Sequence, residues 1–448
     1  MRSLRALAAL FALVALPMPS LAAAPPASTI SALDLLELQI GYTTLLATYY
    51  LPITPRQLAG GARTGIAAYL LSRGIDDAKL PYVPQRLDRG DGGDFIDGAV
   101  LKVLLRYGSR LRSDDLVQAA LSGETAALHD PYTLLFHPKA FTSFNRFLNG
   151  ATFGGIGAVV TLENSGVRAR IESVIAQGPA AKAGVEPADE IVAIDGAPVA
   201  GKNGGALLAK LRGAVGSTVH LTLLRGGNPL PPLAIVRAKI TPPVVLSRVL
   251  PGGAGYIQLT RFGDDAAAQL GAALAAFAKQ NVDALVLDLR GNGGGYGDEA
   301  KKVASAFIAA GPIFSTRERS GTATVEKASG HVAYTGKLAV LVDGDTASAS
   351  EIVAGALQDD GRATLVGTKT FGKGVVQSVF PLPDGAGLKV TTARYFTPKG
   401  RNIDRSGITP DIIVPEPADA KRGDPAADPQ LARALVALRA RAAVPTAQ

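Results

Sequence analysis

Residues 338–357, LAVLVDGDTASASEIVAGAL, predict a buried strand that turns directly into a helix. The apolar run 338–342 is typical of a buried strand, residues 343–346 are turn formers, and helical character begins at Ala349. Ser348 therefore lies at a helix N-terminus, where the first N–H groups lack intrahelical partners and can stabilise an oxyanion. Serine is also a frequent helix N-cap, so this corner alone does not distinguish a nucleophile from a cap.

Strands and helices alternate on both sides of this corner, between residues 242 and 415. The expected strands cover 256–259, 284–289 and 338–342, and the expected helices cover 264–279, 298–310 and 349–357. Such alternation predicts an α/β core with a largely parallel sheet.

The remaining segments differ in pattern. Three- and four-residue apolar spacings predict helices over 31–150, interrupted by a Gly-rich loop at 88–94. From 153 to 238 the chain has short β-type runs, with two short helices expected at 180–183 and 204–211. Residues 416–448 are rich in Ala, Pro and Asp and predict a loose tail with one short helix near 430–439.

The N-terminus has the three parts of a secretory signal peptide. Arg2 and Arg5 precede eleven apolar residues, 6–16, and small residues follow at 22–24. An apolar run of this length is too short to span a hydrocarbon core as a helix. We expect residues 1–24 to direct export to the periplasm or the extracellular space. An uncleaved signal that keeps the protein membrane-associated is the alternative.

Composition excludes several classes of protein. The 448 residues contain no cysteine, which excludes disulfides, thiolate nucleophiles and Cys-ligated metal sites. Apolar residues make up 47% of the chain and charged residues 19%, which is typical of folded domains. The net charge of +8 is not gathered in basic runs, so we expect no nucleic-acid partner.

A second candidate segment is GTKTFGKGVVQSVF, residues 367–380. It superficially fits a phosphate-binding loop, but Gly374 stands where a Ser or Thr should bind magnesium, and a strand follows instead of a helix. A nucleotide site is therefore rejected. Lys373 and Gln377 remain. An ordinary lysine, with a pKa of about 10.4, is almost fully protonated at pH 7, but desolvation could lower that pKa and make a nucleophile–base pair with a nearby hydroxyl workable. An exposed turn lysine is the alternative.

The third segment is DLRGNGGG, residues 288–295, which directly follows an apolar strand. Successive glycines allow backbone N–H groups to approach an anion without Cβ hindrance. A flexible strand–helix loop is the simpler interpretation of this segment taken alone.

Together these segments resemble the carboxy-terminal processing proteases, exported serine peptidases with a Ser-Lys dyad and an inserted PDZ domain. The resemblance covers residues 31–440 and includes two departures in the first matching segment and Gly293 in place of the family's proline. In chain order the matching segments are HDPYT (129–133), FGGIG (153–157), GPAAKAGV (178–185), IDG (194–196), DLRGNGGG (288–295), TASASEI (346–352), TFGKG (370–374) with Gln377, and GITPD (407–411).

The resemblance implies an α/β multi-domain protein. Residues 31–150 would form a helical N-terminal region, 153–238 a PDZ domain and 242–415 a crotonase/ClpP-like α/β core, followed by the tail 416–448. No metal or organic cofactor is expected.

Position by position, the resemblance also implies roles at the site. Ser348 would be the nucleophile, Lys373 the general base and Gln377 the residue that orients the lysine amine. The backbone N–H groups of Gly294 and Ala349 would form the oxyanion hole.

Two other assignments compete with this one. Ser350 is the competing nucleophile, although the motif places the catalytic hydroxyl at Ser348. A Ser-His-Asp triad is the poorer hypothesis because the four histidines are scattered and none is beside a candidate serine. They are His129, His137, His220 and His331.

The PDZ resemblance implies capture of a substrate's C-terminal carboxylate by the backbone N–H groups of Gly155, Ile156 and Gly157. The predicted protein is thus an exported endopeptidase that acts on unfolded or flexible protein C-termini through an acyl-enzyme. A homo-oligomer and a regulatory adaptor remain open. The rival hypothesis is a catalytically inactive PDZ scaffold that binds C-terminal peptides.

Overall fold

The computed structural model describes residues 30–76, 79–148, 150, 152–163, 168–175, 177–199 and 209–440. The predicted signal peptide, 1–24, and most of the helix expected at 204–211 lie outside these residues. The chain forms two compact units. One comprises Met1–Tyr42 and Pro55–Ala127, and the other comprises Thr43–Thr54 and Leu128–Gln448. Among the described residues, the structure contains no helix with the length and apolarity needed to cross a membrane.

The first unit is helical, as predicted for residues 31–150, although the strand Leu134–Phe136 within that range was not predicted. Its helices are α1 (Ala32–Thr48, which continues into the second unit), α2 (Pro55–Ser72), α3 (Arg89–Tyr107), the 3-10 turn η1 (Gly108–Arg110) and α4 (Ser113–Ala126).

The loop expected at 88–94 is wrong, because α3 already begins at Arg89. Asp88 and Asp91 form a reciprocal capping box that starts the helix. A Cβ at Gly92 would lie 2.2 Å from the Tyr42 hydroxyl, so this glycine allows close helix packing.

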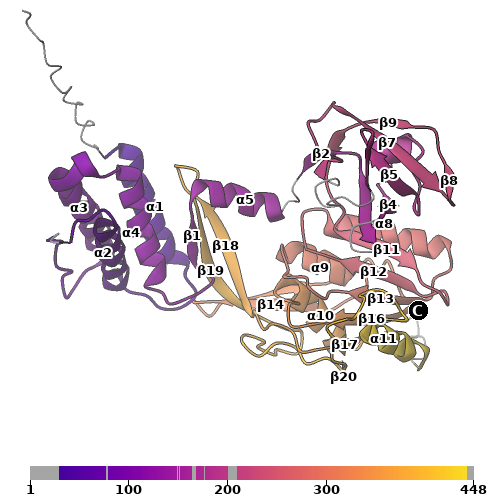
Figure 1. The fold of residues 1–448 in the computed structure, drawn as a ribbon. Helices are drawn as coiled ribbons and strands as arrows, with labels where there is room; N and C mark the ends of the chain where they lie inside the picture. Colours follow the sequence, from indigo (N-terminus) through magenta and orange to yellow (C-terminus); the bar gives the residue numbers. More distant parts are fainter. Residues whose placement is uncertain are drawn as a thin grey trace, which may run out of the picture. The chain divides into compact units, whose positions relative to one another are not determined.

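The core of the second unit is a six-stranded sheet, in which all neighbours except β11 and β12 run parallel (Figure 1). Its strand order is β11 (Val245–Val249), β12 (Gly255–Leu259), β13 (Ala284–Asp288), β16 (Lys337–Val342), β17 (Thr364–Gly367) and β20 (Ile412–Ile413). Helices α8 (Ala266–Lys279), α9 (Gly297–Ser305) and α10 (Ala349–Asp359) connect these strands. The predicted alternation and the parallel sheet are confirmed.

Both faces of this sheet are buried, which explains its uninterrupted apolar strands. Along β16, Leu338, Val340 and Val342 pack in one core with α8, α9 and α10, whereas Ala339 and Leu341 belong to a second core. Helix α11 (Pro429–Ala440) covers this second face with Leu431, Ala434 and Leu438 (Figure 1). The short helix predicted near 430–439 is confirmed, but the loose packing predicted for this tail is wrong through residue 440. Each buried leucine of α11 stabilises the packing by about 1.5–3 kcal/mol.

The second unit also contains a five-stranded sheet. It pairs β1 (Leu134–Phe136), β19 (Gly387–Phe396), β14 (Pro312–Glu318) and β15 (Ala323–Lys327), and β18 (Val375–Pro381) joins β19 as an antiparallel hairpin. Helix α5 (Pro138–Leu148) follows β1. The strand predicted after Gly374 is confirmed, and Lys373 lies just before it.

The region between α5 and β11 forms its own antiparallel β-structure. The strands are β2 (Phe153–Gly155), β3 (Ala158–Glu163), β4 (Arg168–Val174), β5 (Glu190–Ile194), β6 (Ala197–Pro198), β7 (Thr218–Arg225), β8 (Asn228–Pro229), β9 (Leu233–Val236) and β10 (Ala238–Ile240), with the short helix α6 (Pro179–Lys182). A separate apolar core, which includes Ile171, Ile191 and Leu221, holds it together.

Candidate active site

Ser348 lies at a strained corner between β16 and α10. Its φ of 58° and ψ of −117° fall in a region that costs a non-glycine residue about 1–3 kcal/mol. The preceding turn is held by Ala347, whose N–H donates to the Asn292 carbonyl at 3.0 Å. The predicted strand–turn–helix corner is confirmed, and the half-buried Ser348 lines a cavity of about 440 Å³.

Glu351 ties the Ser348 segment to the Lys373 segment. Its Oε2 accepts the backbone N–H groups of both Ser348 and Lys373, each at 2.9 Å. Its Oε1 accepts the Thr370 hydroxyl at 2.6 Å and the Gly372 N–H at 2.7 Å. Burial raises the pKa of Glu351, although these four donors favour its charged form. This role of Glu351 was not predicted from the sequence, although an acidic residue at the third position of helix α10 is a signal for it.

Lys373 lines the same cavity as Ser348. Burial, together with the charge of Lys389, lowers the pKa of Lys373 to about 8, while Glu351 and Asp130 oppose this shift. With a pKa of about 8, about a tenth of the amine is neutral at pH 7. The Nζ atom lies 5.2 Å from the centroid of the Tyr132 ring. The exposed turn lysine considered above is thus excluded.

Gln377 also lines the cavity, on β18 beside a bulge between Val376 and Gln377. Its Nε2 makes a long contact of 3.5 Å to the Thr391 hydroxyl. Within the described residues it makes no hydrogen bond to the Lys373 amine. Orientation of that amine by Gln377 therefore stays a prediction.

The Gly-rich loop packs directly against the corner. Gly294 has a φ of +101°, and a Cβ there would lie 2.8 Å from the Ser348 Cβ and 2.9 Å from the Ala349 nitrogen. Its N–H is not open as the oxyanion prediction requires, because it donates to Asn292 Oδ1 at 2.9 Å. Ala349 is the first residue of α10, where an N–H has no intrahelical acceptor.

Ser350 has a structural role. It is fully buried, and its hydroxyl donates to the Asn292 carbonyl at 2.8 Å. A serine in this position cannot reach a substrate carbonyl in the cavity. Among the described residues that line the cavity there is also no histidine.

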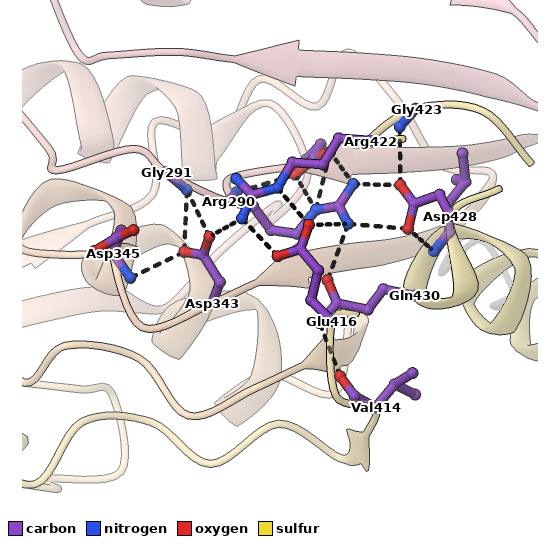
Figure 2. Close-up of polar contacts among 12 residues, drawn as sticks. Arg290, Gly291, Asp343, Asp345, Val414, Glu416, Arg422, Gly423, Asp428 and Gln430 are labelled. Atoms are coloured by element: carbon purple, nitrogen blue, oxygen red, sulfur yellow. Dashed lines mark hydrogen bonds and ion pairs between the residues drawn. The ribbon is translucent and has the colours of Figure 1, made fainter. Parts of the chain in front are cut away.

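A charged network supports the two loops beside Ser348 (Figure 2). Asp343, in the turn after β16, accepts the Gly291 N–H at 3.0 Å and the Thr346 N–H at 2.9 Å. Arg422 donates to Asp343 Oδ2 at 2.7 Å and also pairs with Glu416. The segment before α11 thus braces the turn that leads to Ser348.

The second half of this network is fully buried (Figure 2). Arg290 pairs with Asp288 at 2.6 Å and with Asp428 at 2.7 Å, and its Nη1 donates to Gln430 at 2.9 Å. Removing one partner of such a network leaves a buried charge uncompensated, which typically costs 3–5 kcal/mol. The contacts of Arg290 with Asp428 and Gln430 join residues about 140 positions apart, so sequence spacing could not predict them.

The residues predicted to capture a carboxylate lie at the start of the separate β-structure. Gly155 pairs with Ala238 in β10, and the buried Ile156 accepts the Ala180 N–H at its carbonyl. Gly157 has a φ of +74°, which favours glycine. Their role in carboxylate capture stays a prediction.

Comparison with known proteins agrees with this architecture. Residues 253–414 match the family described as peptidase family S41, and residues 170–225 match the PDZ domain. The carboxyl-terminal-processing protease of Synechocystis is 36% identical over 312 residues, which cover 68% of this chain and 73% of that protein. The carboxy-terminal processing protease CtpB of Bacillus subtilis is 32% identical over 373 residues, which cover 80% and 76%. A Bartonella bacilliformis relative is 38% identical over 68% of this chain and 71% of that protein.

The described fold is thus a helical region, a PDZ domain and an α/β protease core, and its relatives are serine-type peptidases. The chain belongs to the carboxy-terminal processing protease family within peptidase family S41.

Proposed function

We propose that this protein is an exported serine endopeptidase in which Ser348 is the nucleophile and Lys373 the general base. The observation that carries this proposal is the shared acceptor of the two segments, Glu351 Oε2, together with a common cavity for both side chains. The depressed pKa of Lys373 supports the base assignment, since only a neutral amine can accept the serine proton.

The chemistry has two stages. Neutral Lys373 takes the proton of the Ser348 hydroxyl as its oxygen attacks a peptide carbonyl, and the lysine then gives that proton to the departing amine. The acyl group stays on Ser348 until water, activated by the same amine, releases it. The Ala349 N–H faces the developing oxyanion at the start of α10. The Gly294 N–H donates to Asn292 Oδ1 in this structure and would join the oxyanion hole only on breaking that hydrogen bond.

Substrate selection is assigned to the PDZ domain. The N–H groups of Gly155, Ile156 and Gly157 bind the carboxylate of a flexible protein C-terminus, which adds as a strand. The N-terminal signature of residues 1–24 supports export to the periplasm or extracellular space. Self-association or an adaptor would regulate the encounter.

An inactive PDZ scaffold is the second candidate, and one experiment separates the two. Purified mature protein is incubated with casein beside Ser348→Ala and Ser350→Ala variants. The endopeptidase predicts cleavage that only Ser348→Ala abolishes. No cleavage by the unaltered protein, with C-terminal peptide binding retained, favours the scaffold.

A further inference from the structure

The cavity at Ser348 is lined by three cationic side chains, Arg261, Lys373 and Lys389. Among the described residues, no Asp or Glu lines it, and none forms an ion pair with any of the three. The positive charges come from different elements of the fold. Arg261 follows β12, whereas Lys389 lies on β19 of the hairpin.

Of the three cationic side chains, Arg261 is the one whose buried nitrogens lack hydrogen-bond acceptors within the described residues. Its Nε and Nη2 atoms are buried and have no hydrogen-bond partner among the residues that the structure describes. A guanidinium cannot lose its charge at physiological pH, so burial without an acceptor is unfavourable. Asp265, four residues further along, instead accepts from Gln269 at 2.6 Å.

The backbone around Arg261 is fixed against the loop that flanks Ser348. The Phe262 N–H donates to the Gly294 carbonyl at 3.0 Å, and the Tyr296 N–H donates to the Phe262 carbonyl at 2.9 Å. The backbone of this segment is therefore held beside the loop that contacts the nucleophile corner, and the Arg261 Nη2 atom lies near Gly150, where a Cβ would approach it to 2.5 Å. A ligand paired with the guanidinium lies within the same cavity as Ser348.

The nearby acids are already engaged elsewhere. Glu351 accepts four hydrogen bonds, and Asp130 accepts the Tyr132 N–H and the Thr133 hydroxyl. Neither lines the cavity. The Lys389 amine lies over the rings of Phe136 and Phe144, at 5.6 and 5.8 Å from their centroids, and its surroundings are largely desolvated.

We propose that the cavity is a carboxylate-binding subsite, in which Arg261, assisted by Lys389, holds a carboxylate of the substrate near the scissile bond. The inference rests on the proposed peptidase function and adds a substrate class to it. A guanidinium keeps its charge at physiological pH and pairs with carboxylates through charge-assisted hydrogen bonds. The carboxylate is either an Asp or Glu side chain or the free C-terminus of a short tail.

Binding tests this without requiring turnover. In the Ser348→Ala protein, affinities are measured for matched casein-derived peptides that differ as Glu against Gln at each position in turn, and as free acid against C-terminal amide. We expect at least one acid peptide to bind about tenfold or more tightly than its neutral match. Arg261→Gln, added to Ser348→Ala, should bring that ratio close to one, while Arg261→Lys retains part of it.

The matched control is Arg433→Gln, which removes one exposed positive charge from α11. It should leave the acid preference intact. The PDZ domain also binds free carboxyl ends, so only the part of the ratio that depends on Arg261 counts toward this site. A Glu-specific ratio identifies a side-chain carboxylate, and an acid-over-amide ratio identifies the chain terminus.

Two results would overturn the inference. One is equal affinity for the acid and the neutral member of every peptide pair, measured in the Ser348→Ala protein that keeps Arg261. This result needs no Arg261 variant, so it counts even if such a variant fails to fold. The other is an acid preference that survives Arg261→Gln in protein with an unchanged melting temperature. Absence of Ser348-dependent cleavage with an intact, Arg261-dependent preference would instead reject the peptidase function and keep the subsite.

Discussion

Ser348 and Lys373 donate their backbone N–H groups to the same atom, Glu351 Oε2, each at 2.9 Å. The two nitrogens therefore lie no further apart than twice 2.9 Å, although 25 positions separate the residues in the chain. Glu351 is buried and has both oxygens occupied, so it sets the relative position of the two segments.

Replacing Glu351 with Gln should destabilise the protein and lower kcat. A glutamine amide keeps one acceptor oxygen and presents donors to N–H groups that need acceptors. We expect the free energy of unfolding to fall by about 1–3 kcal/mol, as for other buried donors left unsatisfied. Urea denaturation gives the free energy and initial rates give kcat. Unchanged values for both would remove Glu351 from the account.

Activity should depend on the protonation of Lys373. The protonated amine cannot act as a base, so kcat/KM should rise about tenfold per pH unit below a pH of about 8 and level off above it. The measurement is a pH–rate profile on a short peptide substrate. Lys373→Arg should be inactive across the range because its guanidinium stays charged. A flat profile from pH 5 to 9 would argue against a lysine base.

Gly294→Ala should be far more harmful than Gly293→Ala. A Cβ at Gly294 would collide with the Ser348 Cβ and the Ala349 nitrogen, at a backbone φ of +101°, whereas a Cβ at Gly293 meets no heavy atom within 4 Å. Strain of this kind costs about 1–3 kcal/mol. Thermal unfolding and peptide hydrolysis are measured for both variants. Equal behaviour of the two would contradict the described packing of this loop.

Replacing Asp343 with Asn should lower kcat by a larger factor than it changes KM. The carboxylate receives the Gly291 and Thr346 N–H groups and pairs with Arg422, so its loss loosens both loops beside Ser348. Asp345→Asn is the matched control, since Asp345 is exposed and contributes its N–H to this turn. Steady-state kinetics compare the two. Similar kinetics would show that the network does not support catalysis.

Truncation after residue 415 should prevent stable folding, whereas truncation after residue 440 should not. The shorter chain loses Asp428, the buried partner of Arg290, and exposes the apolar face that α11 covers. Soluble expression and circular dichroism distinguish the outcomes. A folded protein that ends at residue 415 would support the prediction, made from composition alone, that the tail is loose.

Sequence patterns predicted the elements whose signals are local. The run of apolar residues before Asp343, with the turn and helix after it, placed Ser348 correctly at a corner. The strand after Gly374 was also local, because β-branched residues follow one another there.

Features that depend on distant partners could not be predicted. The composition of the segment before α11 predicts a loose chain. Yet Asp428 is buried and pairs with Arg290, about 140 positions away. Whether the Gly294 N–H is open to an oxyanion depends on whether another acceptor already engages it. The Gly-rich motif does not show that. Likewise, nothing near Arg261 in the sequence signals a guanidinium whose Nε and Nη2 lack partners within the described part of the chain.

The most direct measurement of the central claim is acylation of Ser348 followed by intact-mass spectrometry and peptide mapping. A slowly deacylating substrate is mixed with the unaltered protein, Ser348→Ala and Lys373→Ala at several pH values. We predict an adduct on Ser348 alone, which forms faster as the pH rises toward about 8 and is absent from both variants. An adduct on another residue, or one that forms equally fast in Lys373→Ala, would contradict the Ser348–Lys373 pair.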